Sequence, residues 1–213
     1  MTKAMTRAQR LKEASAKRRR DKKVATRRAI LDASYELFQE QGYEDFSLRQ
    51  VAEAIGYSPT TIYLYFADKD DLLFHTAMEG FRTFGARLQA AYDSSADPLE
   101  RLRAQGRAYV EFGLEHPVSY RLMFMQRGEF LSRELPESEA PVIDSFGILF
   151  KTVEECLSAN LIKPGDARSY SALIWAGVHG VVALVVGTPH LSSEEAIGLL
   201  ELHHSILLNG IKQ

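Results

Sequence analysis

Cysteine and long apolar runs are scarce in this 213-residue sequence. The single cysteine, Cys156, excludes an intrachain disulfide and is compatible with a reducing cytoplasm. The longest apolar stretch, residues 172–187, is shorter than the roughly 20 residues that a membrane-spanning helix needs, and it contains His179. We therefore expect a cytoplasmic protein without a membrane-spanning segment, in which this stretch forms a buried helix.

The sequence patterns of catalysis and of metal binding are missing as well. The chain contains no GxSxG motif, no phosphate-binding P-loop and no GxGxxG motif after a strand. His203 and His204 are adjacent and would point apart on a helix, and no HxxxH or HxxE spacing places two metal ligands on one helix face. We expect neither an enzyme nor a protein that holds a metal ion or another cofactor.

Helical periodicity extends along most of the chain. No stretch of strand length alternates with period two, and capping residues precede the apolar periodic segments, so the expected fold class is all-α. A basic N-terminal arm (1–23), a helix-turn-helix domain (24–72) and a larger helical domain (73–213) are the expected parts. In the last part we expect helices over 69–92, 98–114, from 141 to before Pro164, 167–186 and 193–208, a short segment at 120–125 and an exposed acidic loop at 128–140.

Positive charge is concentrated at the N-terminus. Residues 1–28 contain 12 Lys or Arg and only two acidic residues, Glu13 and Asp21, in a chain whose formal net charge is −2. A basic block such as residues 17–23 can bind phosphates, and arms of this type in other helix-turn-helix proteins enter the minor groove of DNA. The alternative is a solvated, disordered tail that only improves solubility. In both cases we expect a flexible segment.

One segment has the features of two short helices that are joined by a tight turn. Ser47 and Gln50 match a capping box, and Gly56 can adopt the left-handed conformation that ends a helix. Ser58 then caps the next helix and Pro59 occupies its first position, where no N–H is needed. Two helices with a glycine-containing turn between them form the helix-turn-helix arrangement, which places the second helix in the major groove of DNA.

The second of these helices has an unusual outer face. Ile62 and Phe66, four positions apart, form the stripe that packs inward, which leaves hydroxyl and phenol groups outside. Such groups can bond to phosphates, and a Thr methyl or a Leu side chain can contact a thymine methyl. The alternative is an ordinary helical hairpin whose Tyr side chains pack on a neighbour. Asp68 is expected to cap the next helix, whose first residue is Lys69. The candidate DNA-binding residues are Arg28, Ser47, Arg49, Ser58, Pro59, Thr60, Thr61, Tyr63, Leu64, Tyr65 and Lys69.

The DNA-binding domain of TetR-family transcriptional regulators resembles residues 25–78 of this chain, which contain TRRAILDASYELFQEQGYEDFSLRQVAEAIGYSPTTIYLYFADKDDLL. The resemblance implies three helices, the start of a fourth, and an operator of double-stranded DNA as the partner. Thr60 stands where family members often have Gly, and Leu64 stands where His is frequent. Both positions lie on the expected reading face, so the resemblance does not specify the operator sequence.

The last two long helices have the composition of a helix–helix interface. Small residues recur at every fourth position from Ala172 through Ala176 to Gly180, which allows another helix to approach closely. The final helix is apolar on two sides, and both sides must be covered, either by a deep core of one protomer or by a partner. TetR-like proteins dimerise through their last two helices, so the resemblance implies a homodimer. The candidate interface residues are Ala172, Ala176, Gly180, Ala183, Ile197, Leu200, His204 and Leu207.

A second resemblance concerns the C-terminal half of the chain. Trp175 and His179 share a helix face, and with Gly180 they resemble the Trp…His-Gly signature of one type of TetR-family C-terminal domain. The segment HPVSYRLMF, residues 116–124, resembles its companion. In the family a small molecule binds in a cavity of this domain, although aromatic residues at helical spacing also fit a plain core. The candidate lining residues are Tyr109, Phe112, Tyr120, Met123, Phe124, Phe146, Phe150, Trp175 and His179.

These features together predict a ligand-responsive, dimeric DNA-binding regulator. The simplest form is a repressor that an apolar or aromatic small molecule releases from its operator. The alternative is a helical dimer that binds a small molecule or a protein partner and has no sequence-specific DNA function. The basic N-terminal segment and the hydroxyl and phenol groups of the expected reading face favour the regulator.

Overall fold

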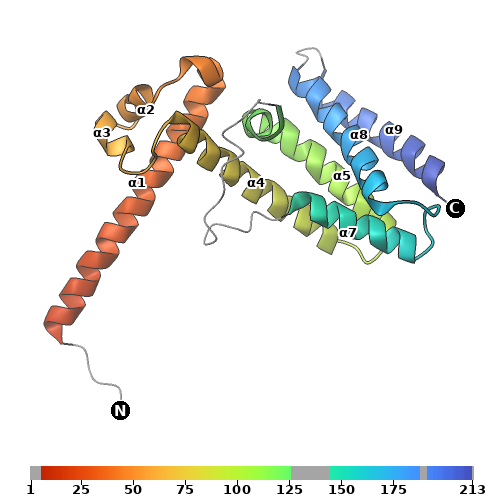
Figure 1. Ribbon diagram of the computed structural model, residues 1–213, viewed down its shortest axis with the longest axis horizontal. Helices are drawn as coiled ribbons and strands as arrows, with labels where there is room; N and C mark the ends of the chain where they lie inside the picture. Colours follow the sequence, from red (N-terminus) through yellow and green to blue (C-terminus); the bar gives the residue numbers. More distant parts are fainter. Residues whose placement is uncertain (1–5, 126–143, 188–190, 213) are drawn as a thin grey trace. The chain divides into compact units, whose positions relative to one another are not determined.

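The computed structural model describes residues 6–125, 144–187 and 191–212, and the chain divides into two compact units. The first unit extends to Thr76 and the second begins at Ala77. Helices build both units (Figure 1). Within the described residues the only β-type pairing is an isolated bridge between Ile162 and Lys212. The prediction of an all-α fold is therefore confirmed.

The helices are distributed over the two units as follows. The first unit contains α1 (Arg7–Asp45), α2 (Leu48–Ala54), α3 (Pro59–Ile62) and the start of α4 (Lys69–Asp93). The second unit contains the rest of α4, α5 (Pro98–Glu115), α6 (Pro117–Tyr120), the π-helical turn η1 (Arg121–Met125), α7 (Ser145–Ser158), α8 (Ala167–Gly187) and α9 (Ser193–Ile211). The acidic loop expected at 128–140 and the helix start expected at 141 lie outside the described residues.

Helix α9 continues past the end that the sequence suggested at residue 208. Its start is as expected, because Ser192 and Glu195 form a capping box. The Asn209-Gly210 pair does not end the helix, since the N–H of Lys212 still bonds to the carbonyl of Leu208 at 2.8 Å. A glycine lowers helix propensity by about 1 kcal/mol relative to Ala, which a packed helix tolerates.

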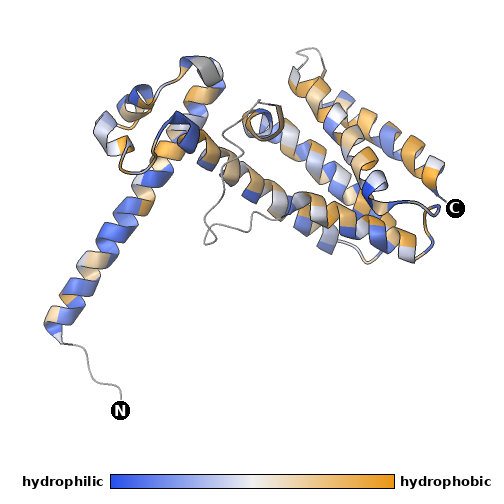
Figure 2. Ribbon diagram, viewed as in Figure 1, coloured by the Kyte–Doolittle hydropathy of each residue, from blue (hydrophilic) through white to orange (hydrophobic). Residues whose placement is uncertain are grey.

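The N-terminal segment that we expected to be flexible is helical from Arg7 onward. Thr6 caps α1, and Gln9 completes a capping box with it. The segment is rich in Ala, Lys, Arg, Glu and Gln, which have high helix propensity, and no Gly or Pro interrupts it before Gly42. All side chains from residue 6 to residue 25 are exposed, and Figure 2 shows this part of α1 as hydrophilic. High helix propensity and the N-terminal cap therefore stabilise this part of α1, whose side chains are not buried.

The core of the first unit is built around the two residues that the sequence predicted to face inward. Ile62 and Phe66 are fully buried, together with Val51 of α2. The hydroxyl groups of Ser34 in α1 and Thr76 in α4 lie 3.0 Å apart in the interior, where a buried polar group needs a partner. Helices α1, α2, α3 and the start of α4 therefore form one unit.

Helix α5 is the central helix of the second unit. It packs against α7, α8 and α9, and α8 packs in turn against α7 and α9. Their shared core includes Leu102 of α5, Cys156 of α7, Ile174 of α8 and Leu208 of α9. Burial raises the pKa of the Cys156 thiol to about 11, so this thiol stays protonated and serves as a small apolar side chain.

The contact between α5 and α9 depends on a glycine. A Cβ added to Gly106 of α5 would lie 2.3 Å from Nε2 of His204, so only a glycine leaves room for this imidazole. His204 is 4% exposed, and burial, together with the positive charges near it, lowers the pKa of His204 to about 4. The folded protein therefore holds this histidine neutral.

This buried histidine predicts a pH-dependent stability. The unfolded chain takes up a proton at His204 near pH 6.5 and the folded chain only near pH 4, so stability is highest above pH 6.5 and falls as the pH is lowered through this range. We expect the free energy of unfolding to be lower at pH 5 than at pH 7 by about 2 kcal/mol because of His204. Urea unfolding at fixed protein concentration, followed by the fluorescence of Trp175, measures this loss.

His204→Gln is the matched variant, because glutamine is of similar length and does not titrate. Its unfolding free energy should change less between pH 7 and pH 5 than that of the wild type, whatever its stability at pH 7. Parallel pH dependences of the two proteins would show that this histidine is not the source.

Candidate functional site

The turn between α2 and α3 has the local geometry of a helix-turn-helix. The N–H of Ser47 donates to the side chain of Gln50 at 2.7 Å, and the hydroxyl of Ser47 accepts from the N–H of Gln50, which completes the predicted capping box. Gly56 has a φ of 69°, the left-handed conformation that a residue without Cβ adopts at little cost. The hydroxyl of Ser58 accepts from the N–H of Thr61 at 3.3 Å, with Pro59 in the first turn.

Helix α3 is a single turn long and does not extend to Phe66. It spans Pro59–Ile62 and then tightens, because the N–H groups of Leu64 and Tyr65 bond to the carbonyls of Thr61 and Ile62 at 3.2 and 2.9 Å. Such three-residue bonds commonly close the last turn of a helix. The tightened turn carries the chain from Ile62 to Phe66 while both side chains stay buried.

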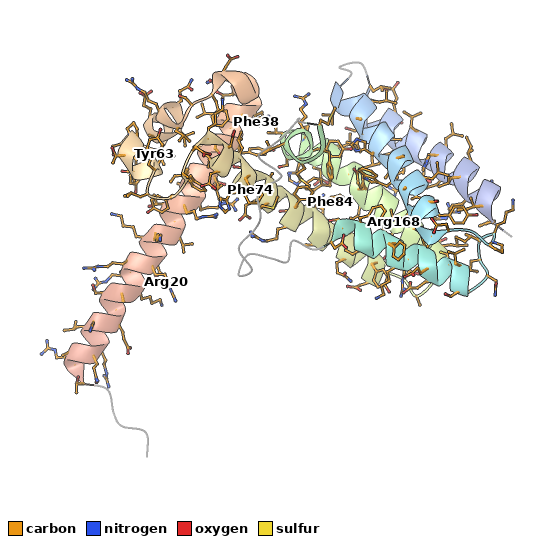
Figure 3. The ribbon with its side chains drawn as sticks, viewed as in Figure 1. Arg20, Phe38, Tyr63, Phe74, Phe84 and Arg168 are labelled. Atoms are coloured by element: carbon orange, nitrogen blue, oxygen red, sulfur yellow. The ribbon has the colours of Figure 1, made fainter. Side chains whose placement is uncertain are left out.

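The outer face of α3 and of this turn is open to solvent. Tyr63 is 58% exposed and Leu64 is 75% exposed, and Figure 3 shows Tyr63 on this face. Ser58, Pro59 and Thr60 are exposed as well, whereas Thr61 and Tyr65 are half-buried. Two adjacent large side chains, together with the neighbouring hydroxyl groups, are therefore available for contact with a partner.

Two of the candidate arginines lie in exposed ion pairs. Nε of Arg28 is 2.9 Å from Asp32, and Nε of Arg49 is 3.1 Å from Glu53, each on the next turn of the same helix. Exposed pairs of this kind contribute little to stability, so either guanidinium can exchange its carboxylate for a phosphate.

Acidic side chains accept the hydrogen bonds at the start of α4. Asp68 caps the helix as expected and accepts from the N–H of Asp71 at 2.7 Å, while the Asp71 carboxylate accepts from the N–H of Ala67 at 2.8 Å. These two carboxylates therefore already accept hydrogen bonds from backbone N–H groups that could otherwise bind a phosphate. Nζ of Lys69 lies 4.8 Å from the centroid of the Phe46 ring, so this side chain also stabilises the unit.

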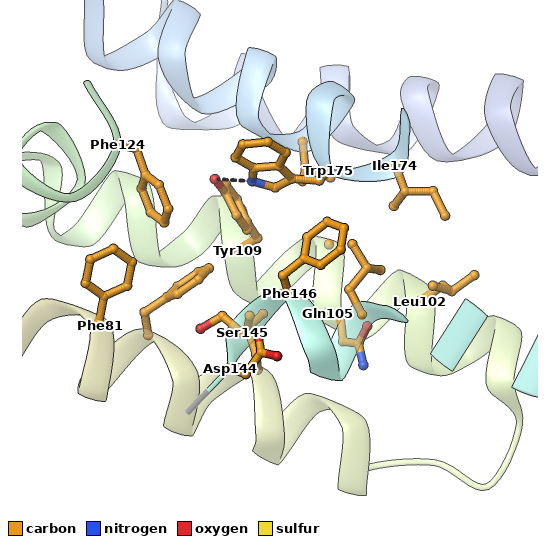
Figure 4. A pocket seen from close by; sticks show the side chains of 15 residues that line it. Phe81, Leu102, Gln105, Tyr109, Phe124, Asp144, Ser145, Phe146, Ile174 and Trp175 are labelled. Atoms are coloured by element: carbon orange, nitrogen blue, oxygen red, sulfur yellow. Dashed lines mark hydrogen bonds between the residues drawn. The ribbon is translucent and has the colours of Figure 1, made fainter. Parts of the chain in front are cut away.

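A cavity of about 390 Å³ lies inside the second unit (Figure 4). Four of the predicted residues line it, namely Tyr109, Phe124, Phe146 and Trp175. The sequence analysis missed the remaining lining residues, which are Phe81, Phe84, Leu88, Leu102, Gln105, Gly106, Asp144, Ser145, Leu149, Ile174 and Val178. The three from α4 recur at spacings of three and four, a signal that was present in the sequence.

Five predicted lining residues do not line this cavity, namely Phe112, Tyr120, Met123, Phe150 and His179. Phe112 is buried behind the wall, where its ring centroid lies 5.0 Å from that of Phe84. Met123 is also buried, and its sulfur fills the space beside Gly80. Phe112 and Met123 therefore belong to the packed core around the cavity and not to its lining.

A chain of hydrogen bonds fixes the aromatic wall. Nε1 of Trp175 donates to the hydroxyl of Tyr109 at 3.2 Å, as the dashed line in Figure 4 marks. The Tyr109 hydroxyl lies 3.3 Å from that of Tyr120, which in turn lies 2.5 Å from Nδ1 of His179. Burial raises the pKa of Tyr109 to about 12 and lowers that of His179, so the phenols are protonated and the imidazole is neutral. His179 is thus a bonded interior histidine.

Apart from Met125 of η1, the exposed large apolar side chains described in the second unit lie on its last two helices. Leu173, Trp175 and Leu184 of α8 and Leu202 and Ile206 of α9 are all exposed, and Figure 2 shows both helices as largely hydrophobic. We name Leu173, Leu184, Leu202 and Ile206 the α8/α9 face, whereas Trp175, two positions from Leu173, points to another side of α8 and lines the cavity. By length and composition α8 could cross a membrane, but it packs against α5, α7 and α9 as part of the bundle.

The predicted interface residues of α8 belong to this side of the helix. Ala172 and Ala176 are exposed, and a Cβ added to Gly180 would meet no atom within 4 Å, so the small-residue ridge is open. Ala183 is half-buried.

The predicted interface residues of α9 lie elsewhere. Leu200 is 0% exposed and His204 is 4% exposed, because both pack inward, next to Gly106 of α5. Ile197 and Leu207 are half-buried, and Leu207 packs against the core of the bundle. The other apolar side of α9, with Leu202 and Ile206, faces outward instead.

Within the described residues no group of three His, Cys, Asp or Glu side chains could hold a metal ion. The polar side chains in the cavity wall are Gln105, Tyr109, Asp144, Ser145 and Trp175. The first unit thus presents an exposed helix-turn-helix surface, and the second unit contains a mainly apolar cavity.

Comparisons with known proteins agree with this arrangement. Residues 30–76 match the sequence model of bacterial regulatory proteins of the tetR family, and residues 102–201 match that of the tetracyclin repressor-like C-terminal domain. Rv0472c of Mycobacterium tuberculosis, an uncharacterized HTH-type transcriptional regulator, is 27% identical over 190 residues, which cover 89% of this chain and 80% of that protein.

Two solved structures from Rhodococcus share the fold. A protein of unknown function from Rhodococcus sp. RHA1 has a TM-score of 0.71 and 26% identity, and the match covers 88% of this chain and 95% of that one. A tetR-family regulatory protein from Rhodococcus RHA1 has a TM-score of 0.68 and 21% identity, over 87% and 96% of the two chains. Both halves of the sequence match this one family of regulators, and the chain belongs to the TetR family of bacterial transcriptional regulators.

Proposed function

We propose that this regulator is a homodimeric repressor in the cytoplasm that a small molecule in the α4–α5–α7–α8 cavity releases from its operator. The observation that carries the proposal is the course of α4. Its first turns belong to the helix-turn-helix unit, and the same helix supplies Phe81, Phe84 and Leu88 to the cavity wall. A ligand that repositions this wall therefore also acts on the helix whose first turns belong to the DNA-binding unit.

The mechanism is a choice between two spacings of the DNA-binding units in the dimer. One spacing matches successive major grooves about one helical turn apart, and the other does not. A ligand shifts this choice only by binding the two states with different affinity, and the coupling is reciprocal, so operator DNA must also weaken ligand binding. The Trp…His-Gly type of C-terminal domain fits this scheme, since Trp175 lies in the cavity wall and His179 holds the tyrosines behind it.

The alternative function is a helical dimer that binds a ligand or protein without reading DNA. The exposure of Tyr63 and Leu64 beside the hydroxyl of Thr60 disfavours it, because these side chains lie on the helix that a helix-turn-helix presents to the major groove. Fluorescence anisotropy with genomic DNA fragments selected by the protein, at two salt concentrations and with unrelated competitor DNA, tests the two functions. Binding that survives competitor supports the regulator, and binding that competitor abolishes for every fragment supports the alternative.

Tyr63→Ala should weaken operator binding about tenfold, or roughly 1.4 kcal/mol, by removing one phosphate or base contact of α3. The same anisotropy titration measures this loss. Arg168→Ala is the matched control, because it removes an exposed side chain and a positive charge from the second unit. Equal affinities of the wild type and Tyr63→Ala would contradict docking through α3.

Deleting residues 1–22 should reduce the salt dependence of DNA binding. Each lost phosphate contact lowers the slope of log K against log salt concentration by about 0.9, because fewer counterions are released. The deletion removes no core contact, since these side chains are exposed where described. Replacing Arg18, Arg19 and Arg20 by Gln keeps the helix and should lower the slope in the same direction. An unchanged slope in both proteins would make the segment irrelevant to DNA binding.

Ile206→Glu should weaken the dimer at least about tenfold, because it places a charge in the middle of the α8/α9 face. Sedimentation equilibrium over a range of protein concentrations measures the dissociation constant. Leu11→Glu is the matched control, since Leu11 is also an exposed apolar residue but lies in α1. A dimer that both substitutions leave intact would exclude the α8/α9 face as the interface.

A further inference from the structure

The cavity wall contains an amide oxygen that no group of the described protein satisfies. Gln105 lines the cavity from α5 and is 4% exposed. Its Oε1 is buried and has no hydrogen-bond partner among the described residues. Leaving a buried acceptor unpaired costs free energy, so native proteins rarely keep one without a use for it.

The neighbouring hydrogen bonds fix which end of the amide is unpaired. The hydroxyl of Thr152 in α7 donates to the carbonyl of Ile148 at 3.0 Å, so its oxygen is left to accept. It accepts from Nε2 of Gln105 at 2.8 Å. Because the single hydroxyl proton of Thr152 is already used, the amide cannot turn round without losing this bond, and Oε1 remains the unpaired end.

The surroundings of Gln105 define the rest of the ligand. Aromatic rings from five elements, namely α4, α5, η1, α7 and α8, line the cavity, and their edges and faces suit a ligand with flat rings (Figure 4). The hydroxyl of Tyr109 accepts from Trp175 and lies within hydrogen-bonding distance of Tyr120 and His179, so it is already engaged. Of the two buried polar side chains in the cavity wall, Gln105 and Tyr109, Gln105 therefore keeps an unused hydrogen-bond acceptor.

We propose that the effector is a ring-containing, mainly apolar molecule whose hydroxyl or N–H group donates a hydrogen bond to Oε1 of Gln105. This inference rests on the proposed function of the cavity. Because Oε1 is buried, binding requires the wall to shift, and the lining residues that can do so are Phe146 and Leu149 of α7, which are only half-buried. Selectivity follows, because a ligand without a donor leaves the oxygen unpaired.

Two probes of nearly the same shape test the inference. 4-Hydroxybiphenyl carries a donor, whereas 4-methoxybiphenyl has the same rings and only an acceptor. Each is titrated into the full-length protein, and the fluorescence of Trp175, which lines the cavity and is the single tryptophan, reports binding. We expect the hydroxyl probe to bind about tenfold more tightly than the methoxy probe, the ratio that one neutral hydrogen bond supplies.

Gln105→Leu should remove this preference, with the loss confined to the hydroxyl probe. Thr152→Val should reduce it as well, because the amide of Gln105 is then free to turn its Nε2 toward the cavity. Thr152→Ser is the matched control and should keep the wild-type preference, since its hydroxyl can still accept from Nε2. An equal ratio of the two affinities in the wild type and in Gln105→Leu would overturn the inference, and so would a failure of both probes to bind.

Anisotropy with operator DNA separates this inference from the proposed function. A donor preference that depends on Gln105, without any effect of the saturating hydroxyl probe on DNA affinity, would support the binding inference and contradict release by ligand. Release of DNA by both probes at equal concentrations would support the proposed function and overturn the role of Gln105.

Discussion

The close approach of α8 and α9 to α5 is the constraint on which the second unit depends. Two glycines of α5 make it possible, since a Cβ on Gly106 would meet His204 at 2.3 Å and one on Gly113 would meet Cγ1 of Val182 at 2.2 Å. These contacts set the rotation of α8 and α9 about their own axes. They therefore decide which residues line the cavity, which are buried, and which form the α8/α9 face.

The cavity persists because its rings support one another from behind. The Phe84 ring lies edge-on to Tyr109, with centroids 5.1 Å apart, and it also contacts Phe112. Tyr109 is bonded to Trp175 on its cavity side. A ring that is held on two sides cannot rotate to fill the empty space, so the open volume coexists with a tightly packed surrounding core. Trp175 is also partly exposed, so it lies at the edge of the cavity wall.

The parts of the structure that the sequence predicted well are those that local interactions determine. The caps at Ser47, Ser58 and Ser192 and the left-handed Gly56 each depend on residues within one helical turn. The rotation of α9 could not be predicted, because both of its sides are apolar and only the contact with Gly106, nearly a hundred positions away, selects the buried one. Five of the nine predicted cavity residues do not line it, since periodicity identifies the inward side of a helix but not what each inward residue contacts.

The division of the cavity wall among helices bears on how ligand binding can affect DNA binding. A contact that is equally strong in both states of the dimer raises affinity without shifting the equilibrium. Phe81, Phe84 and Leu88 belong to α4, the helix that continues from the DNA-binding unit, whereas Gln105 belongs to α5 at the centre of the bundle. Contacts with α4 are therefore the ones that can differ between the states. Gln105 selects which molecule binds, and the rings of α4 determine whether its binding is transmitted.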